Sequence, residues 1–121
     1  MSTTFEIKDT EVPEGNYAAD FVGYEQKTHE EYGEGLCWEW QIADGKYKGR
    51  SVYRTTSCNP TTRNACGAVL AALGGQSQSD GVTVNPDSYI GKRYLVIVKK
   101  SPSGKGTRVH ELILKDSETP F

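Results

Sequence analysis

The sequence predicts a mostly β domain of five strands, with one helix between the third and fourth strands. In residues 36–42, large apolar residues alternate with Cys, Glu and Gln, and this period of two is typical of a strand with one buried face. Residues 60–73 form the single segment whose apolar positions have helical spacing. Residues 93–99 are apolar and β-branched in their middle, which is typical of an interior strand.

Three strands are expected before the helix. Aromatic and small residues at 17–24 suit the first strand, which follows a turn signal in residues 13–16. The charged, glycine-containing residues 30–35 predict a loop. After the second strand, residues 43–49 have the composition of a turn, and residues 50–56 return as the third strand of a hairpin.

The helix has start and stop signals in the sequence. Asn59 is suited to the N-cap, Pro60 is tolerated in a first turn, and Gly74 is suited to the C′ position. One face is apolar and is expected to close one end of the sheet; it consists of Cys66, Val69, Leu70 and Leu73.

The last two strands follow a polar loop. This loop covers residues 74–81, and a turn at 101–106 joins the interior strand to a final strand at 107–114. The resulting order of elements is that of a five-stranded, partly open OB-fold barrel with Greek-key connections. Another small β-barrel or a half-open sandwich would have the same order of elements.

Length and composition restrict the class of protein. The 121 residues provide for one domain, expected at residues 1–115, followed by a tail at 116–121. No window approaches the ~18 to 20 apolar residues of a membrane span, and the first residues lack a signal pattern, so we expect a cytoplasmic protein without membrane contacts. Neither a disulfide framework nor a zinc site nor any cofactor is expected from the cysteines and histidines, which are Cys37, Cys58, Cys66, His29 and His110.

Charge is divided unevenly along the chain. Residues 1–45 contain eleven acids and two lysines, whereas residues 46–115 contain twelve Lys or Arg and three acids. Cations interleaved with aromatic residues are suited to a polyanion, because they attract phosphates while the rings stack on bases. The alternative is a solvated basic surface that offsets the acidic segment by ordinary ion pairing.

Several motifs resemble a phage-type family of OB-fold single-stranded DNA-binding proteins. They are the opening Glu14-Gly15-Asn16-Tyr17, the second strand with its Asp-Gly-x-Tyr-x-Gly-Arg turn at residues 44–50, Asn59-Pro60 before the helix, and the Tyr89-Ile90-Gly91-Lys92-Arg93 entry to the fourth strand. The resemblance covers most of residues 12–115. The sequence differs from that family in its second strand, where two tryptophans stand in positions often held by smaller apolar residues.

The last residues are similar to the tails with which bacterial and phage single-stranded DNA-binding proteins dock partners. They combine acids with a terminal Pro-Phe. The resemblance implies that this tail binds replication or recombination proteins, through Asp116, Glu118, Pro120 and Phe121. An acidic end without function is the alternative.

The expected DNA-contacting residues lie on the hairpin and on the last two strands. We expect phosphates to meet Arg50, Arg54, Lys99, Lys100, Lys105 and Arg108, with His110 nearby, and bases to stack on Tyr47, Tyr53 and Trp38. Trp38 and Trp40 share a face with Leu36 and Ile42, so the alternative is that both are core residues. Tyr53 and Arg54 are adjacent and should point to opposite faces of a regular strand.

The sequence therefore predicts a protein that binds single-stranded DNA without marked sequence preference, in phage or bacterial replication or recombination. A homo-oligomer is compatible with this function. The alternative is a phage-encoded protein-interaction module or inhibitor of a host factor. Catalysis is not expected, because the acids at 30, 31 and 34 are typical of a solvated loop and no phosphate-binding glycine loop is present.

Overall fold

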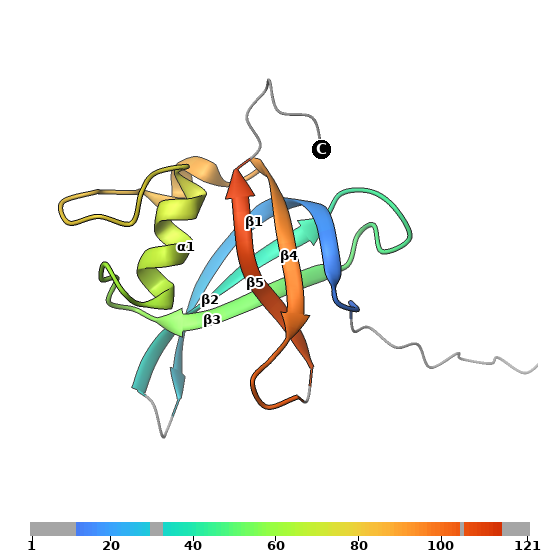
Figure 1. The fold of residues 1–121 in the computed structure, drawn as a ribbon, viewed down its shortest axis with the longest axis horizontal. Helices are drawn as coiled ribbons and strands as arrows, with labels where there is room; N and C mark the ends of the chain where they lie inside the picture. The colour runs from blue at the N-terminus through green and yellow to red at the C-terminus, as the bar shows by residue number, and fades with distance from the viewer. Residues whose placement is uncertain (1–11, 30–32, 105, 115–121) are drawn as a thin grey trace, which may run out of the picture.

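The computed structural model describes residues 12–29, 33–104 and 106–114, and it contains the predicted order of elements (Figure 1). Three strands precede the α-helix and two follow it, with a short 3-10 helix that the sequence did not predict. The elements are β1 (Gly15–His29), β2 (Gly33–Ile42), β3 (Ser51–Ser57), α1 (Ala65–Leu73), η1 (Pro86–Tyr89), β4 (Arg93–Lys100) and β5 (Thr107–Leu114).

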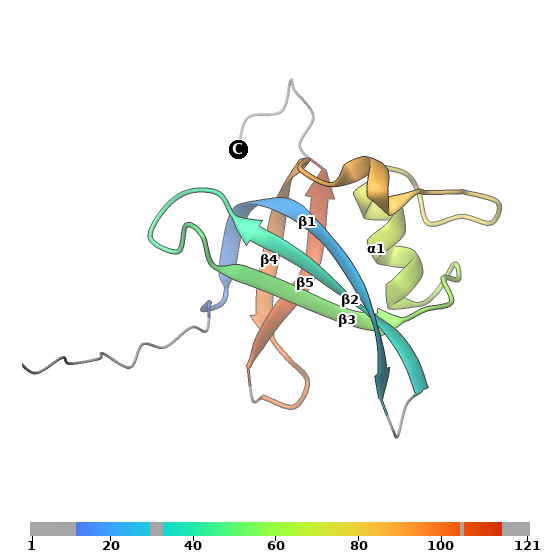
Figure 2. The same cartoon turned by 180° about the vertical axis from the view of Figure 1, so that it is seen from behind.

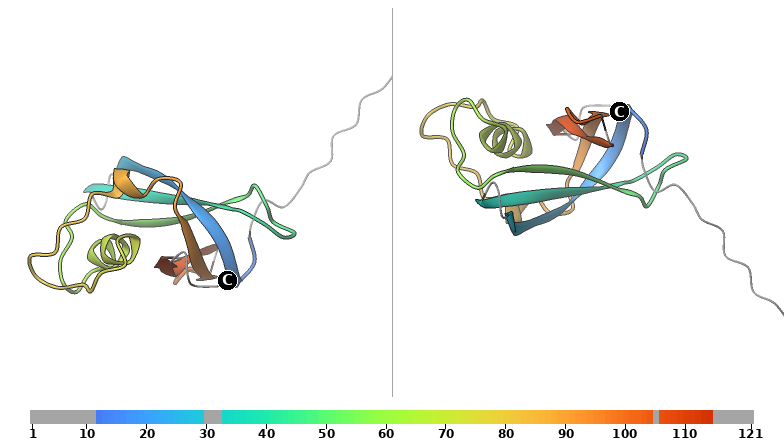
Figure 3. Two further views of the ribbon diagram at one scale, coloured as in Figure 1. Left: turned by 90° about the horizontal axis from the view of Figure 1, so that it is seen from above. Right: turned by 90° about the horizontal axis from the view of Figure 1, so that it is seen from below.

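The strands form one antiparallel sheet in the order β3-β2-β1-β4-β5. Because β4 returns to pair with β1 after the β1-β2-β3 meander, the first four strands have Greek-key order. Figure 2 shows β1, β2 and β3 crossing in front of β4 and β5, so the sheet is strongly bent. Helix α1 lies beside the two edge strands of the sheet, β3 and β5, and contacts both (Figure 3). The predicted mostly β fold with its helix between the third and fourth strands is confirmed.

The hairpin of β1 and β2 is longer than predicted. The sequence indicated a loop from residue 30 to residue 35, but Gly33 to Gly35 pair with His29 to Lys27. Charged residues are compatible with this part of the hairpin, because its side chains outside the core are exposed to solvent. The register shifts between Phe21 and Gly23, which marks a bulge in β1.

The core lies on the concave side of the bent sheet. Its largest fully buried side chains are Trp38, Trp40, Tyr94 and Phe21. In β4 the residues at 94, 96 and 98 are buried, whereas those at 95 and 97 are half-buried. The continuous apolar run of this strand therefore belongs to an interior strand with one face in the core.

Helix α1 begins later than predicted, at Ala65, with Asn64 as its N-cap in place of Asn59. The Asn64 side chain accepts hydrogen bonds from the backbone N–H groups of Gly67 (2.9 Å) and Thr61 (3.0 Å). Its amide group donates to the carbonyl of Asn59 (2.7 Å), so Asn59 and the residues after it form a loop that holds the cap. Local hydrogen bonds of this loop select between two asparagines that are equally good caps by residue type.

The helix ends at Leu73, as predicted, but the glycine in the C′ position is Gly75 and not Gly74. Gly74 is still in a right-handed conformation, and Gly75, with φ of +63°, occupies the C′ position. The N–H of Gly75 donates to the carbonyl of Ala72 and that of Gln76 to the carbonyl of Ala71, the two bonds of a Schellman motif.

Gly67 is a point at which the helix and the preceding loop touch. A Cβ atom on Gly67 would lie 1.9 Å from the carbonyl oxygen of Thr61 and 2.9 Å from Gln78 Nε2. Replacing Gly67 by alanine is therefore expected to lower the free energy of unfolding by about 1–3 kcal/mol or more, because backbone must move. Urea denaturation measures this change. Gly106→Ala is the control, since no atom lies within 4 Å of its Cβ position and no unfavourable φ applies; equal losses in the two variants would contradict the prediction.

Candidate functional site

Three cations and one tyrosine line the same cavity at the end of the molecule that carries the β2–β3 turn. Lys46, Tyr47 and Arg50 lie in that turn and Lys100 ends β4; we call these four residues the turn cluster. They line a surface cavity of about 720 Å³ together with Pro13, Glu14 and Thr107. The sequence predicted three of these four residues as nucleic-acid contacts, and the structure brings them together from segments about fifty residues apart.

The turn has a defined backbone that positions Tyr47 and Arg50. The N–H of Ile42 donates to the carbonyl of Arg50 (2.8 Å), and the N–H of Gly49 donates to the carbonyl of Ile42 (2.9 Å). Gly49 has φ of +89°, a conformation that favours glycine. The Asp-Gly-x-Tyr-x-Gly-Arg sequence therefore forms a closed turn in which Tyr47 is half-buried against the core.

The ring of Tyr47 is packed against other groups of this region. The ring of Tyr17 meets it edge-on, with centroids 5.9 Å apart and planes at 89°. Arg50 Cζ lies 5.3 Å and Lys46 Nζ 5.6 Å from the Tyr47 ring centroid, within cation–π range. The Tyr17 hydroxyl donates to the carbonyl of Pro13 (2.7 Å), and burial, followed by proximity to Tyr47, raises the pKa of Tyr17. Tyr47 is thus held in place with cations next to its ring.

The turn cluster has an excess of positive charge. Among the described residues that line its cavity, the one acid is Glu14, whose carboxylate accepts a hydrogen bond from the backbone N–H of Lys100 (3.3 Å). In the part of the chain that the structure describes, the ion pairs are Arg93–Asp20 and Lys27–Glu25, and both lie outside the cluster. An anionic ligand would therefore meet three cations that no carboxylate neutralises by direct pairing.

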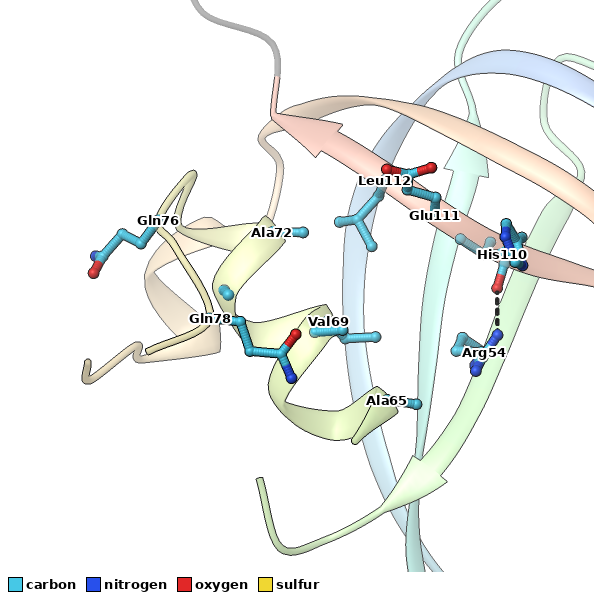
Figure 4. A pocket seen from close by; sticks show the side chains of 12 residues that line it. Arg54, Ala65, Val69, Ala72, Gln76, Gln78, His110, Glu111 and Leu112 are labelled. Carbon is cyan, nitrogen blue, oxygen red and sulfur yellow. Dashed lines mark hydrogen bonds between the residues drawn. The ribbon is translucent and has the colours of Figure 1, made fainter. Parts of the chain in front are cut away.

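A second pair of cations, Arg54 of β3 and Arg108 of β5, lies where the two edge strands meet; we call it the seam pair. Arg54 Nη1 donates to the carbonyl of Val109 in β5 (3.2 Å), which links the edges. Arg54 Nε is buried and has no hydrogen-bond partner among the residues that the structure describes. Burial, and then the charge of Arg108, lowers the pKa of Arg54. Arg54 also lines a cavity of about 280 Å³ between α1 and β5 (Figure 4).

Tyr53 and Arg54 point to opposite faces of β3, as the sequence predicted. Tyr53 is 47% exposed on the outer face, where it lies directly opposite Glu39 of β2. The Glu39 carboxylate accepts a hydrogen bond from the hydroxyl of Ser51 (2.8 Å). This carboxylate is an unfavourable neighbour for a phosphate, so Tyr53 lies in a less basic environment than Tyr47.

The remaining predicted contacts lie outside the turn cluster. Lys99 is exposed and faces Arg108 across the β4–β5 ladder, and His110 is exposed at a register shift in that ladder. Lys105 and the proposed partner-binding residues of the tail, Asp116, Glu118, Pro120 and Phe121, lie outside the described residues.

The prediction that bases stack on Trp38 is wrong for this structure. Trp38 is 1% exposed, and its indole N–H donates to the hydroxyl of Thr56 (2.9 Å). β4 and β5 cover the face of β2 that carries both tryptophans, so Trp38 and Trp40 are core residues. The exposed aromatic next to Trp38 is Tyr24, with ring centroids 5.3 Å apart.

Sequence reasoning missed Lys46, Tyr17 and Glu14 as members of this region. Lys46 was visible as part of the Lys46-Tyr47-Lys48 stretch, but nothing in the local pattern separates it from Lys48. Tyr17 and Glu14 come from the start of β1, and the sheet brings them to the turn. No sequence signal shows this proximity.

Within residues 12–29, 33–104 and 106–114, no group of three or more His, Cys, Asp or Glu side chains is arranged to hold a metal ion. Over these ranges there is also no helix with the length and apolar character needed to cross a membrane. The three cysteines are free thiols, and burial raises the pKa of Cys66.

The fold and the site together define the class of this protein. It is a mostly β protein with a five-stranded antiparallel sheet, one helix and a basic cluster that includes a tyrosine. The chain belongs to the family described as "Protein of unknown function (DUF669)", whose model matches residues 2–113. No curated protein and no solved structure matches the chain.

Proposed function

We propose that this protein binds single-stranded DNA without marked sequence preference, and that the turn cluster is its primary contact. The observation that carries the proposal is that Lys46 and Arg50 lie beside the ring of Tyr47, and that Lys100 lines the same cavity. Cations supply sequence-independent attraction to phosphates, and a tyrosine ring supplies a stacking surface that any base can use. A base that stacks on Tyr47 would take the place of one cation beside the ring and leave that cation to the phosphate.

The proposed fold is a partly open barrel of the OB type. The strand order, the helix between β3 and β4, and the Arg54 bond from β3 to the backbone of β5 support it. In such a fold the sheet supplies a rigid platform and the turns carry the ligand contacts. The position of the turn cluster on the β2–β3 turn and the end of β4 agrees with that arrangement.

The proposed role is in phage or bacterial DNA replication or recombination, in the cytoplasm. This part of the proposal is supported by the resemblance of residues 12–115 to phage-type single-stranded DNA-binding proteins. The acidic tail with Asp116, Glu118, Pro120 and Phe121 would recruit a partner protein. No cofactor and no catalytic step is part of the proposed function.

Fluorescence anisotropy with labelled oligo-dT of increasing length, at several salt concentrations, tests the proposal. We expect affinity to increase with length and to fall steeply with salt. The three cations of the turn cluster alone predict a slope of log K against log salt of about −2, because each neutralised phosphate of a single strand contributes about −0.7. Absence of length-dependent binding at low salt would contradict DNA binding and favour the protein-interaction module.

A further inference from the structure

We propose that a bound strand continues beyond the turn cluster along the line where β3 meets β5, and that each arginine of the seam pair, Arg54 and Arg108, contacts a further backbone phosphate. This inference rests on the proposed function. The proposed path crosses the junction of the two edge strands. It does not run over the outer face of β2 and β3, which carries Tyr53 and Glu39.

The two cavities lie one after the other along the same two strands. Thr107 of β5 lines the cavity of the turn cluster, and Val109 to Leu112 of β5 line the cavity beside α1. On the β3 side, Arg50, the residue just before this strand, lines the first cavity, and Arg54 of β3 lines the second. The two arginines are four residues apart in the chain, which is about 13 Å for an extended backbone. A strand that leaves the first cavity along this line reaches the second.

Between the cavities the junction is closed by core residues. Val52, which lies between Arg50 and Arg54 in the chain, and Val109, which forms a wall of the second cavity, are both buried. Arg108 stands between Thr107 and Val109 and alternates with them, so its side chain points away from the core. The strand would therefore cross this closed part on the outside, past Arg108, and reach Arg54 at the wall of the second cavity.

The charges of the seam pair are incompletely satisfied. Arg54 and Arg108 are close enough for the charge of one to disfavour that of the other, and neither belongs to an ion pair among the described residues. Arg54 Nε has no acceptor, although Nη1 has one. An oxyanion with several acceptor atoms would relieve the repulsion and, after a small movement of the guanidinium, provide the missing acceptor.

The other walls of the second cavity limit what can bind there. The helix presents Ala65, Val69 and Ala72, and Figure 4 shows these side chains directed across the gap toward β5 and Arg54. Gln78 is already engaged, since its Nε2 donates to the carbonyls of Thr61 and Asn64. Glu111 also lines the cavity and would repel a phosphate, so it sets the end of the path.

A nucleic acid fits these features better than an acidic peptide. Cations recur along the strands from Arg50 and Lys100 to Arg108 and Arg54, which suits a ligand with regularly repeated charges. An acidic peptide could bind to the seam pair alone. The position of the turn cluster on the same line along the strands would then have no role.

The test is the salt dependence of oligo-dT binding by Arg54→Gln and Arg108→Gln, each measured against the parent protein. Both variants are expected to reduce the magnitude of the slope of log K against log salt by about 0.7, the value for one lost phosphate contact on a single strand. Arg93→Gln is the matched control, because Arg93 is an arginine already paired with Asp20 (Nε to Oδ1, 2.9 Å) and lies outside this path. Thermal unfolding of each variant checks that the fold is intact.

The outcomes separate the path from the function. If the parent binds but both variants keep the parent slope, or if Arg93→Gln lowers the slope equally, the path is wrong and the proposed function stands. If the parent does not bind, both fail. Arg54→Gln could unfold, because Arg54 links β3 to β5. In that case Arg108→Gln, whose side chain points away from the core, tests the path by the same expected change in slope.

Discussion

Replacing Trp38 by alanine is expected to lower the free energy of unfolding by about 3–5 kcal/mol, a large part of the roughly 5–15 kcal/mol that stabilises an ordinary domain. Trp38 is one of the largest fully buried side chains, and its ring contacts those of Phe21 and Tyr24. The substitution would leave a large cavity and also remove the hydrogen bond to Thr56. Urea denaturation followed by circular dichroism measures the loss.

Tyr24→Ala is the control for this prediction. Tyr24 is 41% exposed and contacts the same indole, so removal of its ring should cost clearly less than removal of Trp38. The experiment also separates the two roles considered for Trp38. A Trp38→Ala protein that stays as stable as the parent and loses only DNA binding would show that the ring stacks on bases and that its burial is misjudged.

Replacing Tyr47 by alanine is expected to weaken binding to oligo-dT about 5- to 100-fold, because stacking of one base on an aromatic side chain is worth about 1–3 kcal/mol. The fold should remain, since Tyr47 is only half-buried and lies in a turn. Anisotropy at constant salt measures the effect, and thermal unfolding verifies the fold. Tyr47→Phe should bind nearly as the parent does, because it keeps the ring and loses only the hydroxyl.

Tyr53→Ala is the comparison that locates the stacking surface. Stacking on Tyr53 remains a prediction from the sequence, and its exposed ring is available for it. Glu39 directly opposite makes that surface less favourable for a polyanion than the turn cluster, so we expect the smaller loss from Tyr53→Ala. A larger loss from Tyr53→Ala than from Tyr47→Ala would move the primary contact to the outer face of β2 and β3.

Local patterns predicted the elements of this protein well, because secondary structure depends on the period of apolar residues and on turn residues. The alternation in residues 36–42 and the apolar run in 93–99 correspond to β2 and β4. The Gly-containing turn at 43–49 joins β2 to β3. The boundaries were less accurate where two similar residues competed, as with Asn59 and Asn64 for the N-cap, since loop contacts decided between them.

By itself the sequence determined the order of elements, the opposite orientations of Tyr53 and Arg54, and the concentration of cations after residue 45. The tertiary structure alone decided which of these residues meet. The pairing of β1 with β4 brings Lys100 close to Glu14, and the bend of the sheet buries Trp38 and joins Arg54 to the backbone of Val109. Alternation groups side chains on a face of one strand, but which strand or helix covers that face is set by contacts between distant segments, which no local period encodes.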